Sequence, residues 1–279
     1  EALMACVFAA AAWGTFQAVS GYGGYVMGRR MDINVHGRQN SRKMESKYTT
    51  LLLDIDGTLL DFAAAEHQAF GKAMSLHGFT ATDEEYRLYS GINKALWEAF
   101  ERGEVEREEL LVLRFRRLLE ALQRNGDPVL IEQDYQRLLG ECAVLMDGAE
   151  EILSYLAPKY ALYVVTNGVE ETQRNRLRLS GIERYMDGVF ISESIGYQKP
   201  QKEFFDCCFA QIPEKRKDRF LIIGDSFTSD IQGGINAGID TCWFHPTGEP
   251  GTDKIQTRKV REGFLDLEIG SLHDLMELL

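Results

Sequence analysis

Short, mostly apolar runs alternate along the chain with longer segments whose apolar residues recur every three or four positions. The runs predict strands buried on both faces, and they lie at residues 51–53, 161–165, 189–191, 220–223 and 241–244. Segments with helical spacing lie between the later runs, at residues 149–156, 170–179, 202–209 and 230–237. This alternation predicts an α/β fold with a doubly wound parallel sheet.

A long helical stretch separates the first predicted strand from the second. After Asp61 no strand-like run occurs for about 85 residues, so we expect a helical bundle inserted between strands. Its predicted helices cover 62–77, a segment opened by a capping box at 82–85, an apolar face at 96–100, 106–124 and 127–146. A last helix is expected at 271–279. The predicted organisation is therefore a core of 44–61 and 147–279 with an inserted helical unit at 62–146.

The first 43 residues differ in composition from the rest. They carry only Glu1 and Asp32 as acids, and an apolar segment at 2–12 is followed by glycine, tyrosine and then basic residues. A secretory signal would need a basic region before its apolar core, whereas this segment begins with an acid. We expect 1–43 to be an extension or tag that is mostly disordered, with a truncated targeting segment as the alternative.

Composition narrows the range of partners. The chain has 279 residues, of which 44% are hydrophobic, and its net charge of -12 argues against nucleic acid polymers or an anionic membrane surface. No apolar run reaches the roughly 18 residues that a membrane-spanning helix requires. The five cysteines show no zinc-like spacing, so we expect reduced thiols and a cytoplasmic location.

Polar residues follow several of the predicted strands. The sets are Asp54 and Asp56, Thr166 and Asn167, Lys199 before Pro200, and Asp225 with Asp230. The carboxyl ends of parallel strands lie at one edge of a sheet, so these side chains can converge on one ligand. Taken singly, each set has an ordinary explanation as a turn, a helix cap or a solvated lysine. Their occurrence together and in this order favours an active site.

These motifs resemble those of the haloacid dehalogenase-like hydrolase superfamily. The matching segments are Asp54-x-Asp56-Gly57-Thr58, Thr166-Asn167, Lys199-Pro200, and Gly224-Asp225-Ser226 followed by Asp230. The resemblance covers about residues 47–279, and the helical insertion is placed like the cap of that superfamily. It implies a Rossmann-like core, a helical cap and a Mg²⁺-dependent reaction on a phosphate monoester.

The resemblance also implies roles for individual residues. Asp54 would attack phosphorus, and Asp56 would protonate the leaving oxygen and then deprotonate water. Thr166 and Asn167 would hold the phosphoryl oxygens, and Lys199 would balance charge between Asp54 and the phosphate. The metal ligands would be Asp54, the backbone carbonyl of Asp56, and Asp225, with Asp230 orienting the groups around the metal.

The acid at position 56 favours phosphoryl transfer, because dehalogenase relatives lack it. Three segments resemble the branch that hydrolyses pyrimidine nucleoside monophosphates, including non-standard ones: residues 91–97 in the insertion, and residues 191–196 and 231–238 in the core. In that reading Asn93 or Trp97 would contact the base or line the site. The alternative is that Trp97 packs with Phe100 in the cap core and Asn93 caps a turn.

Other readings remain open from the sequence. A sugar-phosphate phosphatase or phosphomutase of the same superfamily is the main alternative, and a binding module would be expected to have lost one of the acids or the lysine. Two departures from relatives, Asp147-Gly148 and Tyr197-Gln198, could alter cap closure or substrate fit. The expected partner is a small phosphate monoester, and the oligomeric state stays open between monomer and dimer.

Overall fold

The structure is a computed structural model that describes residues 46–246, 256–261 and 263–279. The expected extension at 1–43 lies outside these residues and stays a prediction. Within the described ranges, no helix is both long enough and apolar enough to cross a lipid bilayer. The cysteines at 142, 207, 208 and 242 are all free thiols, as expected.

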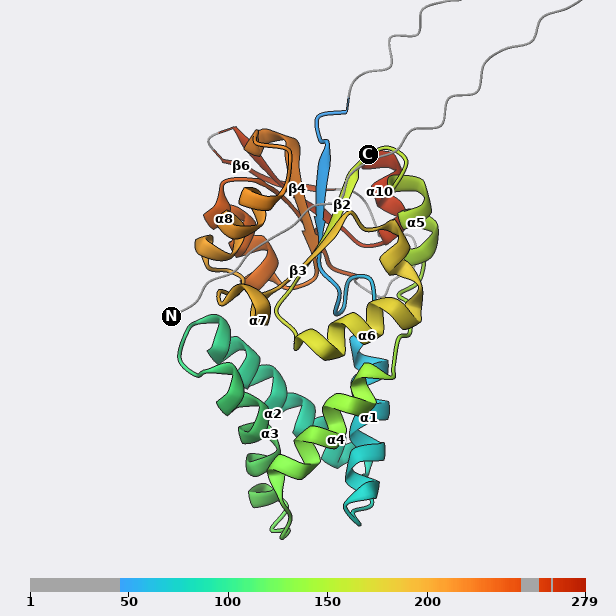
Figure 1. The fold of residues 1–279 in the computed structure, drawn as a ribbon, viewed down its shortest axis with the longest axis vertical. Coiled ribbons are helices and arrows are strands. Elements are labelled where there is room, and N and C mark those ends of the chain that lie inside the picture. Colours follow the sequence, from blue (N-terminus) through green and yellow to red (C-terminus); the bar gives the residue numbers. More distant parts are fainter. Residues whose placement is uncertain (1–45, 247–255, 262) are drawn as a thin grey trace, which may run out of the picture. The chain divides into compact units, whose positions relative to one another are not determined.

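The core is a seven-stranded sheet with the order β3-β2-β1-β4-β5-β7-β6 (Figure 1). Its strands are β1 (Thr50–Leu53), β2 (Ala161–Thr166), β3 (Gly188–Ile191), β4 (Phe220–Gly224), β5 (Asp240–Phe244), β6 (Gln256–Arg261) and β7 (Phe264–Ile269). All neighbouring pairs are parallel except β6 and β7, which are antiparallel. The predicted fold class is therefore confirmed, with a strand order that reverses beside the centrally placed β1.

Alternate residues of the central strands contribute to different cores. Leu51 and Leu53 of β1 belong to a cluster that includes residues of α5 (Ala149–Leu156), α6 (Glu170–Ser180) and α10 (Leu275–Leu278). Leu52 belongs to a second cluster, with residues of α8 (Lys202–Gln211) and α9 (Gln232–Ala237). Because both faces of β1 are covered by helices, its apolar run is unbroken.

Four helices follow β1 before the chain returns to the core at α5 and β2. They are α1 (Phe62–Leu76), α2 (Asp83–Glu101), α3 (Arg107–Ala121) and α4 (Pro128–Gly140). Buried residues of α1 to α4, with aromatic stacking between Phe70, Tyr89 and Phe115, form a core separate from those of the sheet. The chain therefore carries an inserted helical cap on an α/β core, as expected.

The two connections between core and cap pair with each other. The N–H of Asp61 donates to the carbonyl of Val144 at 2.9 Å, and the N–H of Met146 donates to the carbonyl of Leu59 at 3.0 Å. Asp61 also caps α1, because its carboxylate accepts from the N–H of Ala64. The chain thus leaves and re-enters the core through one short paired segment that begins five residues after Asp54.

Several predicted boundaries differ from the structure. The two helical segments expected between 82 and 103 form one helix, α2, which continues through Gly91; the predicted capping box at Thr82 is present. The helix expected to reach residue 146 ends at Gly140, because residues 144–146 pair with the outgoing connection instead. The predicted C-terminal helix is confined to a short turn and α10.

Two strands were not predicted. The β7 segment alternates Leu265, Leu267 and Ile269 with acids, which is the two-residue period of a strand; Leu267 and Ile269 are buried, and so is Asp266. Its acids break the wholly apolar pattern used to find β1 and β4. Strand β6 is the antiparallel edge of the sheet, where unpaired backbone and charged residues are tolerated.

Candidate active site

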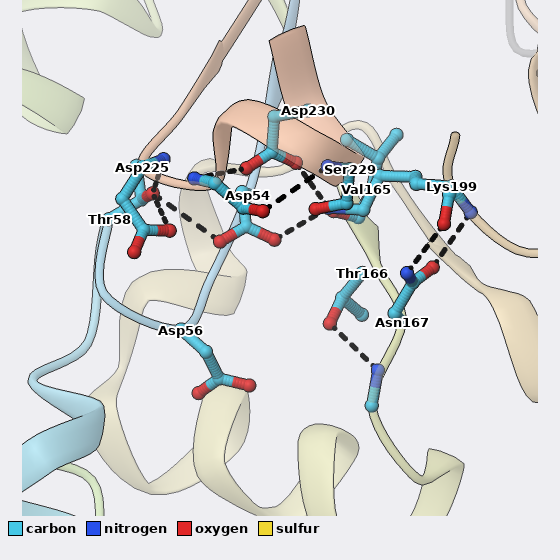
Figure 2. Close-up of polar contacts among 12 residues, drawn as sticks. Asp54, Asp56, Thr58, Val165, Thr166, Asn167, Lys199, Asp225, Ser229 and Asp230 are labelled. Atoms are coloured by element: carbon cyan, nitrogen blue, oxygen red, sulfur yellow. Dashed lines mark hydrogen bonds and ion pairs between the residues drawn. The ribbon is translucent and has the colours of Figure 1, made fainter. Parts of the chain in front are cut away.

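The first acid of the opening motif stands at the carboxyl end of β1. The Asp54 N–H donates to the carbonyl of Ile223 at 3.0 Å, which continues the pairing of β1 with β4 for one more residue. Its side chain is 9% exposed and points toward the acids that follow β4 (Figure 2). The neighbouring strand therefore fixes the backbone from which this carboxylate projects.

Three carboxylates and one ammonium group meet at this edge. Carboxylate oxygens of Asp54, Asp225 and Asp230 lie within 4.8 Å of one another. The Lys199 ammonium donates to Asp54 Oδ1 at 2.7 Å, to Asp230 Oδ1 at 2.6 Å and to the carbonyl of Val165 at 2.9 Å. Lys199 is 1% exposed, so it is a buried cation and not a solvated loop lysine.

Burial and crowding determine the proton affinity of these acids. Burial raises the pKa of Asp54 well above its usual range; Lys199 opposes this rise and the neighbouring acids add to it. Burial, followed by the charge of Asp230, raises the pKa of Asp225 to about 7. Burial alone would lower the pKa of Lys199, but Asp230 and Asp54 outweigh burial and raise it. The lysine is therefore charged.

The donor set fits a divalent cation. The three carboxylates outnumber the one ammonium, so a bound cation would offset the negative charge they carry when ionised, and carboxylate oxygens are hard ligands of the kind Mg²⁺ prefers. Asp230 already binds Lys199 through Oδ1 and the Ser226 N–H through Oδ2, at 3.1 Å. Within the described residues, and apart from the Lys199 contact of Asp54, the carboxylates of Asp54 and Asp225 accept only from the Thr58 hydroxyl, at 3.3 and 3.4 Å, which favours these two acids as direct ligands and Asp230 as an orienting group.

The two polar residues at the carboxyl end of β2, Thr166 and Asn167, make different contacts. The Asn167 side chain donates to the carbonyl of Lys199 at 2.9 Å and accepts from its N–H at 2.8 Å, so it holds the lysine loop. The Thr166 hydroxyl oxygen accepts from Gly168 N at 3.2 Å and from Gln173 Nε2 at 3.0 Å. The proton of the hydroxyl is left to donate to a ligand.

Asp56 lies apart from the other acids. Figure 2 shows its side chain turned away from Asp54. Arg176 Nη1 is ion-paired with Asp56 Oδ1, and Gln173 Nε2 donates to Asp56 Oδ2 at 2.6 Å. The structure thus gathers Asp54, Asp225, Asp230 and Lys199 into one cluster. The Asp56 side chain is instead bonded to two side chains of helix α6.

Four residues with contacts to the site were not singled out from the sequence. Arg176 and Gln173 belong to a helix recognised only as charged and polar. Thr58 lies in the opening motif, and its hydroxyl accepts from the N–H of Asp225 at 3.0 Å. The Trp243 indole N–H donates to the carbonyl of Asp225 at 2.7 Å. Only the fold brings these positions together, so local pattern offered no signal for them, apart from the motif position of Thr58.

A cavity of about 470 Å³ connects the acid cluster with the cap. Asp54, Asp56, Lys199 and Asp225 line its core end, and Asn93, Trp97 and Glu66 line its cap end. Core loops also touch the cap: Thr228 Oγ1 donates to Glu101 at 2.6 Å, and Gln198 Nε2 donates to the carbonyl of Phe100 at 3.3 Å. Gln198 belongs to the pair Tyr197-Gln198, one of the two departures from relatives named for a possible effect on cap closure or substrate fit.

The two cap residues predicted to contact substrate both line the cavity and both have structural contacts. Asn93 is 2% exposed; its amide donates to Glu66 at 2.7 Å and accepts from Arg114 at 3.0 Å. It lies within α2 and caps no turn. Trp97 packs edge-to-face on Phe100 and borders the small cluster of Leu96, Phe100 and Leu110. Phe100 is cap core, as the alternative held.

Comparison with known proteins agrees with this geometry. Residues 48–238 match the family model of the haloacid dehalogenase-like hydrolases. The pyrimidine 5'-nucleotidase PynA of Streptococcus pneumoniae is 40% identical over 71% of this chain and 84% of that protein. The pyrimidine 5'-nucleotidase YjjG of Escherichia coli is 30% identical over 84% of this chain and 98% of that protein.

A solved structure shares both the sheet and the insertion. The HAD-hydrolase YfnB of Bacillus subtilis, crystallised with magnesium, is 41% identical and superposes with a TM-score of 0.74. The match covers 83% of this chain and 98% of that protein, whose magnesium-bound crystal structure reveals interdomain movement. The family model and these relatives span the core and the cap alike. The chain therefore belongs to the haloacid dehalogenase-like hydrolases.

Proposed function

We propose that this enzyme is a Mg²⁺-dependent phosphatase that hydrolyses pyrimidine nucleoside monophosphates, including non-standard ones, through an aspartyl-phosphate on Asp54. The observation that carries the proposal is the cluster of Asp54, Lys199 and Asp225 facing a cavity whose other end is formed by the cap. The similarity to two relatives named pyrimidine 5'-nucleotidases supports the choice of substrate class.

The metal would be held by Asp54, the carbonyl of Asp56, and Asp225, with Asp230 outside its direct ligands. When bound, Mg²⁺ would neutralise phosphate charge that otherwise repels a carboxylate nucleophile. Lys199 contributes a second positive charge beside the Asp54 oxygen to which it is bonded. The Thr166 hydroxyl and the second N–H of the Asn167 amide would donate to the phosphoryl oxygens.

The reaction would proceed in two displacements at phosphorus. An Asp54 oxygen attacks phosphorus, the bond to the nucleoside oxygen breaks, and Asp56 gives that oxygen a proton. Asp56 then takes a proton from water as the water attacks phosphorus, which releases inorganic phosphate and restores the Asp54 carboxylate. Both steps require Asp56 on the side of phosphorus away from Asp54, because attacking and leaving oxygens stand in line.

The cap would determine which leaving group fits. A cavity of about 470 Å³ lies within the range usual for small-ligand sites. Trp97 offers an aromatic face for a pyrimidine ring, and Asn93 with Glu66 offers polar groups at the same end. We propose that residues 62–146 close over the substrate by motion at the paired connections. The enzyme would act on a free small molecule in the cytoplasm.

A phosphate-release panel with Mg²⁺ tests this proposal. The panel should include UMP, dTMP and a 5-halogenated dUMP beside glucose 6-phosphate and ribose 5-phosphate, with Asp54→Asn as the inactive control. We expect the highest kcat/KM with the pyrimidine nucleotides. Higher kcat/KM with sugar phosphates would overturn the nucleotidase assignment in favour of the sugar-phosphate alternative. Turnover by the Asp54→Asn variant would overturn the mechanism.

A further inference from the structure

Both oxygens of Asp56 are held by buried side chains of one helix. Arg176 is 0% exposed and pairs with Oδ1, and Gln173 is 1% exposed and donates to Oδ2 at 2.6 Å. Arg176 Nη1 also donates to Gln173 Oε1 at 3.1 Å, which ties the two donors together. We call Arg176 and Gln173 the α6 clamp. It fixes the direction of the Asp56 carboxylate at two points.

Gly168 leaves the space that the Gln173 side chain of the clamp occupies. A Cβ atom at position 168 would stand 2.4 Å from Gln173 Nε2, so only glycine leaves room for the glutamine here. Gln173 Nε2 also donates to Thr166 Oγ1 at 3.0 Å, and it therefore bridges Thr166 and Asp56. The clamp sets the acid's position relative to a group proposed to bind the phosphoryl oxygens.

The clamp is also bonded to the chain that returns from the cap. Arg176 Nε donates to the carbonyl of Cys142 at 3.0 Å, two residues before the paired connection at 144–146. One turn earlier on α6, the Thr172 hydroxyl donates to Gln136 Oε1 of α4 at 2.8 Å. The arginine that holds Asp56 thus contacts the segment through which cap motion would reach the core.

Burial of the arginine in this ion pair needs a reason other than stability, because the Arg176 side chain is 0% exposed and that of Asp56 is 28% exposed. Burying a charged group costs desolvation energy that offsets its attraction to a partner. The direction in which Asp56 is held supplies that reason. In-line displacement puts the leaving oxygen opposite Asp54, and Figure 2 shows Asp56 turned away from Asp54.

We propose that Arg176 and Gln173 are positioning residues that hold Asp56 where it can exchange a proton with the leaving oxygen. This inference rests on the proposed phosphatase activity and adds two residues to it. The clamp touches neither the acid cluster nor its lysine through any hydrogen bond described above. Its loss should therefore impair proton transfer more than attack by Asp54.

Leaving-group dependence separates these two effects. A nucleoside oxygen needs a proton as it leaves, whereas p-nitrophenolate is stable without one. The parameter kcat/KM reports only steps through departure of the leaving group, so it excludes hydrolysis of the aspartyl-phosphate. For Arg176→Met we expect kcat/KM for UMP to fall about 10- to 100-fold, as for loss of a positioned acid, and that for p-nitrophenyl phosphate to fall less than about 3-fold.

Matched variants make the test specific. Arg174→Met removes an exposed arginine from the same helix, paired with Glu170, and should change neither substrate's kcat/KM. Arg176→Lys keeps the charge without the fork geometry and should recover part of the UMP activity. If Arg176→Met does not fold, Gln173→Met provides the test, because it retains the ion pair. The quantity compared is again the loss in kcat/KM for UMP relative to the loss for p-nitrophenyl phosphate.

Equal losses on both substrates in a folded variant, or no loss on either, would overturn the proposal. Failure of the proposed function would show earlier and differently. A wild-type enzyme that hydrolyses p-nitrophenyl phosphate but not UMP would refute the nucleotide assignment alone. The clamp would then be tested by the same ratio with whichever sugar phosphate the wild type hydrolyses fastest.

Discussion

Removing the buried charge of Lys199 should destabilise the protein far more than removing an exposed lysine. Its ammonium bridges two acids, Asp54 and Asp230, that are 6% and 0% exposed. Deleting one partner of a buried pair typically costs about 3–5 kcal/mol, because the remaining charge is buried without compensation. Partial protonation of Asp54 would leave less uncompensated charge, so we expect the loss in unfolding free energy to lie at the lower end of this range. At about 2–4 °C per kcal/mol, Lys199→Met should lower Tm by roughly 6–20 °C.

Urea unfolding without metal is the assay, and Lys202→Met is the matched control. Lys202 is 54% exposed and pairs with Asp206 one turn along α8, so its removal should cost less than about 1 kcal/mol. Mg²⁺ should reduce the deficit of Lys199→Met, because a cation among the acids replaces part of the missing charge. The added change Asp230→Asn should also recover stability, by removing one uncompensated charge. Equal free energies of unfolding for the two lysine variants would refute the reasoning.

Three further predictions concern the acids and the loop between them. Asp56→Asn should release about one equivalent of p-nitrophenolate in a burst and then turn over about 10²- to 10⁴-fold more slowly, since water attack lacks its base; a proportionally slower reaction without a burst would contradict the base role. Because the pKa of Asp225 is raised to about 7 in the folded protein, its contribution to stability without metal should fall as pH rises from about 4 to 7. The Tm increase caused by Mg²⁺ should therefore be larger at pH 8 than at pH 6, and Asp225→Asn should remove that difference; calorimetry showing the same increase at both pH values would count against metal binding here. Gly57→Ala should abolish activity and weaken Mg²⁺ binding measured by titration calorimetry, because its φ is +85° and a Cβ would stand 2.4 Å from Asp225 Oδ2. Gly78→Ala is its control, with a φ of +78° and open space around the new Cβ, and equal effects of the two would show that backbone strain alone is responsible.

The sheet could be predicted where burial imposes a pattern that can be read locally. Strands β1, β2 and β4 are covered on both faces, so their apolar runs stood out and the polar residues after them marked one edge. Strand β7 combines buried Leu267 and Ile269 with acids, and β6 is the edge strand, so neither matched that pattern. Helix α4 ended earlier than predicted because residues 144–146 pair with residues 59–61, a contact that no local pattern reveals.

The candidate site divides in the same way. The acids and the lysine were predicted because each follows a strand in a motif. Gln173 and Arg176 were missed because residues of a charged helix usually face solvent. They lie 117 and 120 positions from Asp56 in the sequence, and only the fold brings them into contact with it. Asn93 lines the predicted cavity, but its hydrogen bonds to Glu66 and Arg114 belong to a buried network that the sequence did not indicate.

The attachment of phosphate to Asp54 is the most direct test of the account. The Asp56→Asn variant should be mixed with Mg²⁺ and p-nitrophenyl phosphate, whose leaving group needs no proton, quenched in acid within the first turnover, and digested for mass spectrometry. We predict that the peptide containing Asp54 gains the mass of one phosphoryl group, and that Asp54→Asn/Asp56→Asn does not. If the wild type releases phosphate but no peptide of the variant gains a phosphoryl group, or another residue carries that group, the account is contradicted.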